Sequence, residues 1–404
     1  MPGGVGDYTA CLAEALGHQS IAISILTTAA AKDEPTAAPS GLTPSASVVH
    51  RIMPGWGLPD AVRFLRYVAA SRPDAIVIQY QTGAYGMKPL PNLIPALLRL
   101  LKSRPRVVVV FHDLNEPWLA PKSPWLGRLA NRLLARLSDV VVVTNHEDRT
   151  KLQTRYGTIR YEELIPIGSN IADVGLGGSA RDDARHALGI APRVIAAGFF
   201  GFINEWKGVD TLVEAFARAR DRDPRLRLVF IGGSHRPGAA YSFGYADRIR
   251  HRIAALGLDS EVTWTEFGDA DVISGWLHAI DFIVLPFVGG YSYRHGTLIA
   301  AITHGLPIIT TETAVAADGR DCDSLPPLRS DETAELVASG DVDALAASML
   351  RLASDPAYRE RLSRAVVKLS PIFSWDAIAK QMVRAIVHDA AAARYPPRSA
   401  GAPP

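Results

Sequence analysis

A lysine stands between a strand-like segment and a helix-like one, at a position suited to binding phosphate. Lys207 and Gly208 follow the apolar run 194–199 and open the helical pattern 208–222. The lysine supplies a positive charge, and the start of the helix supplies free backbone N–H groups and a favourable dipole. The chemistry that this arrangement predicts is anion binding. For Lys207 taken alone, a solvated loop lysine is the commoner interpretation.

A second anion-binding candidate lies in the loop that precedes the helical pattern 297–303. The backbone amides of His295, Gly296 and Thr297 can surround an anion there, and Arg294 adds positive charge. The simpler alternative is that the glycines of this segment only shape the two ends of a helix.

A histidine ends a buried strand pattern in the first half of the chain. His112 closes the apolar run 107–112 and is followed by Asp113. Open α/β sheets bind their ligands beyond the carboxyl ends of such strands. His112 is therefore either a residue that contacts substrate or a hydrogen-bonded structural histidine.

The chain opens on a glycine loop. Gly3, Gly4 and Gly6 lead directly into the helical pattern 8–16. Loops of this kind normally follow a buried strand. We therefore expect a strand upstream of Pro2 that a late start assignment has removed, the alternative being a fold that tolerates its absence.

Short β-branched runs alternate with helical patterns along both halves of the chain, which predicts parallel sheets with right-handed crossovers. A length of 404 residues suits two such domains. The segment 171–191, with several glycines and a charged helix, is expected to connect them. The expected strands are 21–27, 75–79, 107–112, 140–144, 194–199, 226–231, 261–265, 282–286 and 307–311, and the expected helices are 8–16, 60–71, 93–102, 125–137, 208–222, 246–256, 272–279, 297–303 and 341–353.

The composition excludes several classes of protein. A hydrophobic fraction of 48% and a charged fraction of 21% are typical of a globular chain. Because 43 Lys+Arg nearly balance 41 Asp+Glu, a nucleic-acid partner is not expected. Two cysteines, Cys11 and Cys322, cannot form a disulfide framework or a thiolate metal site. With no membrane-spanning apolar run and no signal-peptide pattern, a cytoplasmic protein is expected.

Taken together, the motifs and their order resemble glycosyltransferase family 4 over nearly the whole chain. The residues that carry the resemblance are the glycine loop, His112, Lys207-Gly208, Gly232-Gly233 and the segment from Gly296 to Pro307, with weaker matches at 165–168 and 373–376. The family implies the GT-B fold, an α/β architecture of two Rossmann-like domains with parallel sheets that face an interdomain cleft. The expected bounds are 1–172 for an acceptor-side domain completed by the crossing helix 374–393, 190–372 for a domain that binds the nucleotide sugar, and 394–404 for a disordered tail.

The resemblance also implies an activity. We expect an enzyme of carbohydrate biosynthesis, a hexosyltransferase that moves a sugar with retention from a nucleotide-diphosphate sugar to a glycan, lipid-linked or small-molecule acceptor. The nucleotide sugar is a co-substrate, and neither a cofactor nor an obligatory metal is expected. His112 matches the catalytic histidine and Lys207 the diphosphate-binding lysine. The further donor-side candidates are Gly3, Gly4, Gly233, Arg294, His295, Gly296 and Thr297, and the acceptor-side candidates are Asp7, Asp113 and Glu116.

Three positions depart from the family's pattern. Phe202 stands where an arginine is usual, and Ser292 and Ala300 replace the usual pair of glutamates. The second glutamate normally binds the donor ribose, so the sequence does not specify the nucleotide or its sugar. Two alternatives therefore stay open: a GT-B sugar-nucleotide epimerase, and a non-catalytic protein that binds sugar nucleotides or glycans.

Two helical patterns, 90–106 and 125–137, place basic residues beside leucines. In the second, the arginines recur four positions apart and are expected opposite the leucines, the members being Arg128, Arg132, Arg136, Leu129, Leu133 and Leu137. Packing on a sheet with solvated arginines is the commoner interpretation. Peripheral contact with the inner membrane face, suited to a lipid-linked acceptor, is the alternative. The oligomeric state stays open.

Overall fold

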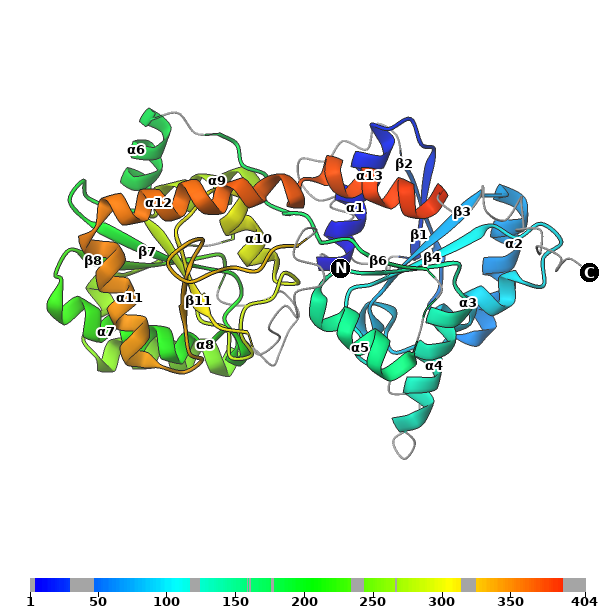
Figure 1. Ribbon diagram of the computed structural model, residues 1–404, viewed down its shortest axis with the longest axis horizontal. Coiled ribbons are helices and arrows are strands. Elements are labelled where there is room, and N and C mark those ends of the chain that lie inside the picture. The colour runs from blue at the N-terminus through cyan, green and yellow to red at the C-terminus, as the bar shows by residue number, and fades with distance from the viewer. Residues whose placement is uncertain are drawn as a thin grey trace, which may run out of the picture. The chain divides into compact units, whose positions relative to one another are not determined.

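The computed structural model describes residues 4–29, 47–116, 124–157, 159, 161–175, 178–233, 243–265, 267–313 and 325–387. The chain divides into two compact units (Figure 1). Unit 1 comprises Met1–Pro166 and Trp375–Pro404, and unit 2 comprises Ile167–Ser374. Both units are α/β with parallel sheets, as the alternation of runs predicts.

Unit 2 is built on one parallel sheet with the strand order β12-β11-β10-β7-β8-β9. The chain fills the sheet outward from β7 to β9 and then returns to the other side of β7 with β10, so the order reverses between β7 and β10. These strands are short apolar runs because helices cover both faces of the sheet. Their bounds are β7 Ile195–Phe200, β8 Leu226–Ile231, β9 Val262–Trp264, β10 Phe282–Leu285, β11 Ile308–Thr311 and β12 Glu335–Val337.

The helices of unit 2 bury their apolar faces against this sheet and against one another. Phe199, Phe230 and Phe216 are fully buried, and α7 packs against α11 over the β7 and β8 side chains. The helical bounds are α6 Gly178–Ala187, η3 Glu205–Lys207, α7 Val209–Arg222, α8 Phe243–Ala255, η5 Asp259–Glu261, α9 Ala270–Ala279, α10 Gly296–Thr303, α11 Val342–Ser354, α12 Pro356–Val366 and η6 Val367–Phe373.

Unit 1 holds two separate parallel sheets among its described strands. One pairs β1 with β2, and the other has the order β3-β4-β5-β6. The strand bounds are β1 Ile23–Thr28, β2 Ser47–Met53, β3 Ala75–Tyr80, β4 Arg106–Phe111, β5 Val140–Val143 and β6 Glu162–Leu164. The helical bounds are α1 Gly4–Gly17, η1 Leu58–Asp60, α2 Ala61–Ser71, η2 Thr82–Tyr85, α3 Leu90–Leu98, α4 Pro124–Leu137 and α5 His146–Tyr156.

The last described helix returns to unit 1. α13, Trp375–Val387, packs against α1, and the ring of Trp375 lies 5.1 Å from that of Tyr8. The Arg106 guanidinium at the start of β4 also donates to the backbone carbonyl of Ala385. Residues 388–393 of the expected last helix and the expected tail 394–404 lie outside the described residues.

The expected glycine loop at the start is wrong in one respect. Gly4 and Gly6 belong to the first turn of α1, so the described part of this segment is helical rather than a loop. Gly3 lies outside the described residues.

Over its described residues, the structure contains no helix that is both long enough and apolar enough to span a bilayer.

Candidate functional site

The point of strand reversal places two loops of unit 2 beside each other. Ligands of doubly wound sheets bind beyond the carboxyl ends of the strands, at the place where the strand order reverses. Here that place lies between β7 and β10. The loop after β7 contains Lys207, and the loop after β10 contains His295 and leads into α10.

Close backbone packing fixes Lys207 at this place. Gly208 has φ of 66°, and a Cβ atom built on it would lie 1.9 Å from the carbonyl oxygen of Pro286. Only glycine fits between the end of β10 and the start of α7, because any side chain would collide with that backbone oxygen. Lys207 therefore projects from η3 towards the loop after β10, with its ammonium 4.7 Å from the centre of the Phe287 ring.

The ammonium group of Lys207 is half-buried and has no carboxylate partner in the described part of the chain. It donates a hydrogen bond of 3.3 Å to the hydroxyl of Thr297, in the first turn of α10. Burial lowers the pKa of Lys207 to about 8. A positive charge held this way favours an anion, because no described carboxylate neutralises it.

His295 stands immediately before α10 and presents a free ring nitrogen. Its ring stacks on Phe287 with the ring centres 3.9 Å apart. Its Nδ1 atom is buried and has no hydrogen-bond partner among the described residues. Burial, with the charges of Lys207 and Arg294, lowers the pKa of His295 to about 3, so the ring is neutral at physiological pH. A buried ring nitrogen without a protein partner among the described residues is available to a ligand that enters this place.

Glycines at the ends of β7 and β8 bring their backbones close to α10. A Cβ atom on Gly201 would lie 2.9 Å from the Thr297 side chain, and one on Gly232 would lie 3.8 Å from the backbone nitrogen of Gly201. Gly233 lies beneath the ring of Phe267, which a Cβ atom would approach to 2.2 Å. The strand ends and the first turn of α10, whose amides have no helical partners, therefore converge.

The candidates of unit 2 thus divide into two groups. The structure brings Lys207, His295, Gly296 and Thr297 together beside the glycines, whereas the side chain of Arg294 is exposed and acts on the group only through its charge on His295.

The three positions that depart from the family's pattern supply no charge here. The Phe202 ring lies 5.5 Å from that of Phe267. The Ser292 hydroxyl is buried and accepts a hydrogen bond from the amide of Arg294. Ala300 is buried within α10. Lys207 is therefore the cation of the β7 loop that lies beside α10.

His112 occupies the carboxyl end of β4 in unit 1. Its amide donates to the carbonyl of Tyr80, and the edge of its ring contacts Tyr8 at 4.6 Å between centres. Its Nε2 atom lies 2.9 Å from the amide oxygen of Gln79, so Nε2 carries the ring proton. Nδ1 has no hydrogen-bond partner in the described residues and is left as an acceptor. Burial lowers the pKa of His112 to about 4, so the ring is neutral.

The acceptor-side candidates differ in their surroundings. The Asp113 carboxylate accepts hydrogen bonds from the Gln81 side chain and the amide of Asn115. Glu116 forms ion pairs with Arg155 and Arg128, and these three residues line a pocket of about 390 Å³. Asp7 lies in the first turn of α1.

A buried polar network that the sequence analysis missed holds the loop after β4. The Tyr80 hydroxyl bonds with Asn92 of α3 and Asn131 of α4, and Asn131 and Thr82 both donate to the carbonyl of Asn115. The available signal was an asparagine within each of two apolar helical patterns. A fully satisfied buried network of this kind fixes the backbone that follows His112.

The second cluster missed by the sequence analysis comprises Asp173, His278 and His304 in unit 2. Burial alone would raise the pKa of Asp173, but the Gly175 amide and His278 hold it below its ordinary value. Burial lowers the pKa of His304.

Two family models match the chain. Glycosyl transferases group 1 matches residues 192–355, and the glycosyl transferase 4-like domain matches residues 3–168. The D-inositol 3-phosphate glycosyltransferase of Corynebacterium glutamicum is 27% identical over 269 residues, covering 63% of this chain and 58% of the relative. That of Kribbella flavida is 25% identical over 267 residues, covering 64% and 58%. The chain therefore spans a little over half the length of these relatives.

Solved structures are similar over nearly the whole chain. Sucrose-phosphate synthase from Thermosynechococcus elongatus has a TM-score of 0.73 and 22% identity, covering 96% of this chain and 94% of that one. Anabaena Alr3699/HepE in complex with UDP and glucose has a TM-score of 0.69 and 17% identity, covering 95% and 96%. At these identities the likeness shows the fold.

Proposed function

Because the chain belongs to glycosyltransferase family 4, the glycosyl transferases group 1, and has the GT-B fold, we propose that it is a retaining glycosyltransferase that uses a nucleotide-diphosphate sugar. The observation that carries the proposal is the half-buried ammonium of Lys207, which bonds to Thr297 in the first turn of α10 and has no carboxylate partner among the described residues. Three kinds of anion-binding group meet there: a cation, helix-terminal amides and glycine backbone.

The chemistry of this place is stabilisation of a leaving diphosphate. When the bond between the sugar and the diphosphate breaks, negative charge builds up on the phosphate oxygens. Lys207 and the amides of Gly296 and Thr297 are already positioned to bind those oxygens. They stabilise the developing charge without moving, which lowers the activation barrier of the transfer. The free Nδ1 of His295 donates a further hydrogen bond to a phosphate oxygen when it carries the ring proton.

Retention of the sugar's anomeric configuration is inferred from membership of the family. In this mechanism the acceptor attacks from the face that the leaving diphosphate vacates, and no covalent sugar intermediate forms. His112, neutral and with an accepting Nδ1, contacts the transferred sugar. Asp113 and Glu116 stay candidates for the acceptor side. The acceptor is a glycan, a lipid-linked sugar or a small molecule, and the reaction has no obligatory metal.

The first experiment identifies the donor. The HepE structure contains UDP and glucose, so UDP, GDP, ADP and dTDP are compared by thermal shift, beginning with UDP and UDP-glucose. One diphosphate is expected to raise the melting temperature, because a ligand that binds only the folded state stabilises it. Transfer of labelled sugar from the matching donor to an acceptor panel then measures the activity.

The alternatives give different products in the same assay. An epimerase releases free nucleotide or an epimerised sugar without an acceptor, and a binding protein shows the thermal shift with no turnover. No shift with any nucleoside diphosphate would contradict the proposed donor site.

The exposed face of α4 supports membrane contact as part of this function. The expected arrangement of α4, with leucines opposite the arginines, is wrong: Leu129 and Leu133 are 42% and 37% exposed, and Trp125 is 57% exposed. The buried face of α4 instead carries Asn131 and Leu134. The three apolar side chains recur every fourth residue, so they form one solvent-facing stripe next to the exposed arginines at 128, 132 and 136.

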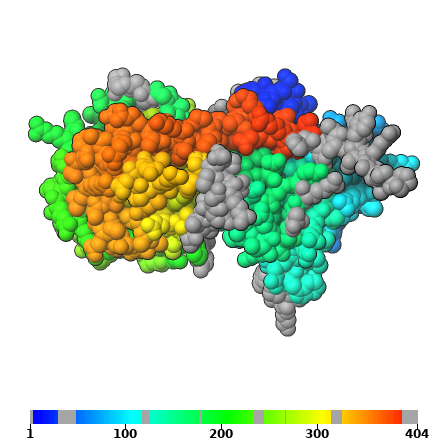
Figure 2. Space-filling view, viewed as in Figure 1, coloured from blue at the N-terminus to red at the C-terminus, as the bar shows by residue number. Residues whose placement is uncertain are grey.

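An anionic lipid surface is the partner that fits this face. Indole and leucine side chains insert between lipid headgroups, and arginines pair with lipid phosphates. The end of α3 adds to the same region, since Arg99 bonds to the carbonyl of Leu137 and Leu100 is 77% exposed. The segment that contains α4, teal in the space-filling view, reaches the surface along the lower edge of its unit (Figure 2).

We expect Trp125→Ala to weaken binding to vesicles that contain a quarter anionic lipid by about tenfold. The matched control is Trp206→Ala, because Trp206 is 78% exposed but belongs to η3 of unit 2 rather than to the arginine-bearing face of α4. Binding is measured by vesicle sedimentation, with neutral vesicles in parallel. Equal binding by the wild type and Trp125→Ala, or binding to neutral vesicles alone, would contradict a membrane role for α4.

A further inference from the structure

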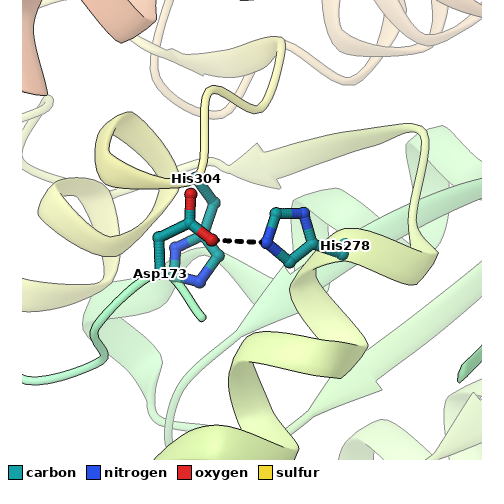
Figure 3. A group of neighbouring side chains, drawn as sticks. All are labelled: Asp173, His278 and His304. Carbon is teal, nitrogen blue, oxygen red and sulfur yellow. Dashed lines mark hydrogen bonds and ion pairs between the residues drawn. The ribbon is translucent and has the colours of Figure 1, made fainter. Parts of the chain in front are cut away.

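Three side chains of unit 2 that take no part in the donor site converge from separate segments (Figure 3). Asp173 comes from the stretch before α6, His278 from the last turn of α9 and His304 from the residue that follows α10. One ligand atom from each lies within 4.8 Å of the others. In sequence these residues lie far apart, so no local motif indicates the cluster.

The orientation of each side chain leaves a metal-binding atom facing the others. The Nδ1 atom of His304 donates to the carbonyl of Ala300 at 2.7 Å, which fixes Nε2 as the atom with the free lone pair. Metal-bound histidines are typically oriented by this kind of hydrogen bond to a carbonyl. The Asp173 carboxylate is held in turn by the amide of Gly175 at 2.8 Å.

Hydrogen-bonding protons now occupy the place where an ion would sit. The Nε2 of His278 lies 2.7 Å from Asp173, and the Nε2 of His304 lies 2.8 Å from the hydroxyl of Ser274. Ser274 also accepts a hydrogen bond from the amide of Val174, which it keeps if its own proton turns away from His304. An ion therefore displaces one proton shared by Asp173 and His278 and requires one hydroxyl to rotate.

We propose that Asp173, His278 and His304 form a structural site for a divalent metal ion of the zinc class, which ties the segment entering unit 2 to α9 and α10. Two imidazoles and one carboxylate suit Zn²⁺, with water as the fourth ligand. Tetrahedral zinc requires ligand atoms about 3.3 Å apart, so side-chain movements on the order of 1 Å complete the site. The ion enters from solvent, because Asp173 is exposed and His278 is half-buried.

The metal site is separate from the donor site, but the two are connected through α10. α10 contains eight residues and begins at Gly296, beside Lys207, while His304 follows its last turn. A metal ion at His304 fixes the end of α10 opposite to the amides that face the diphosphate. The metal-binding proposal stands whether or not the chain transfers sugar.

Zinc binding by the full chain tests the proposal directly. Protein without a histidine tag is treated with a chelator, dialysed, and titrated with Zn²⁺ in a calorimeter. One Zn²⁺ per chain is expected, with the melting temperature rising by about 5 °C at a hundredfold excess over Kd. Mg²⁺ is expected to produce neither effect, and Co²⁺ in place of zinc should give the visible absorption of a four-coordinate ion.

Two variants at accessible positions locate the site without disturbing the core. His278→Ala and Asp173→Asn are each expected to weaken Zn²⁺ binding at least tenfold. His251→Ala removes an exposed histidine of α8 in the same unit and should leave binding unchanged. The proposal fails if the wild type takes up no zinc, or if both His278→Ala and Asp173→Asn bind zinc as tightly as the wild type does.

Discussion

Lys207→Ala is expected to weaken binding of the donor nucleoside diphosphate by about a hundredfold. The lysine is half-buried and unpaired by any described carboxylate, and Phe202 stands where the family usually has a second cation. Losing the charged partner of a desolvated anion costs about 2–5 kcal/mol. Calorimetric titration at pH 7 measures the change.

The control for this variant is a lysine of the same unit outside the site. Lys368 is exposed in η6, so Lys368→Ala should bind the nucleotide as the wild type does. Both variants should keep the wild-type melting temperature within a few degrees. Unchanged affinity in Lys207→Ala would show that the lysine is a solvated loop residue.

The lowered pKa of Lys207 predicts that the affinity for the nucleoside diphosphate depends on pH. Burial lowers the pKa of Lys207 to about 8, so the free protein loses this charge as the pH rises through 8. A bound diphosphate favours the ammonium form and raises that pKa again. Affinity should therefore be constant from pH 7 to below 8 and fall towards pH 9, and the fall should be absent in Lys207→Ala. Phosphate ionisation does not interfere, since its second pKa lies near 6.

His112→Ala is expected to lower turnover by about a hundredfold or more, with little change in melting temperature. The ring is held by Gln79 through Nε2 and by its edge contact with Tyr8, which leaves Nδ1 available to the sugar. Loss of a positioned hydrogen-bonding group typically costs this much. Because burial lowers the pKa of His112 to about 4, activity should show no titration from this residue between pH 5.5 and 8.

A Gln79→Ala variant distinguishes the orientation of the His112 ring from its contact with the sugar. It keeps the imidazole but removes the 2.9 Å partner of Nε2, so turnover should fall by less than in His112→Ala. Single-turnover kinetics with saturating donor measures both variants. Full activity in His112→Ala, or a loss of many degrees in melting temperature, would mean that the histidine serves the fold.

Buried strands were the part of the fold that could be predicted best from sequence. β8 covers 226–231 as predicted, and β5 consists of four valines, because a strand buried on both faces has no polar position to interrupt it. β2 was missed since His50 and Arg51 interrupt its apolar residues. α5 was missed because it is almost wholly polar, although Asn145 caps its first turn.

Motif order predicted the family, and the comparisons confirm it. The proximity of Lys207 to Thr297 depends instead on the reversal of strand order between β7 and β10, a property of the whole sheet. Ligand sets such as Asp173 with His278 and His304 join residues that lie up to a hundred or more positions apart. Spacing along the chain contains no signal for such groups, so only the folded structure reveals them.

The insertion of unit 2 between two pieces of unit 1 has a consequence for synthesis on the ribosome. Unit 2 is continuous, Ile167–Ser374, and can fold as soon as its own residues have emerged. α1 is made before α13, the helix that it packs against, so the contact between them cannot form until the roughly 200 residues of unit 2 have been translated. At a rate of about 5–20 residues per second this interval lasts roughly 10–40 s. During that time the side of α1 that later contacts α13 is accessible to chaperones. A mutation in α13 would impair the folding of unit 1 while unit 2 folds normally.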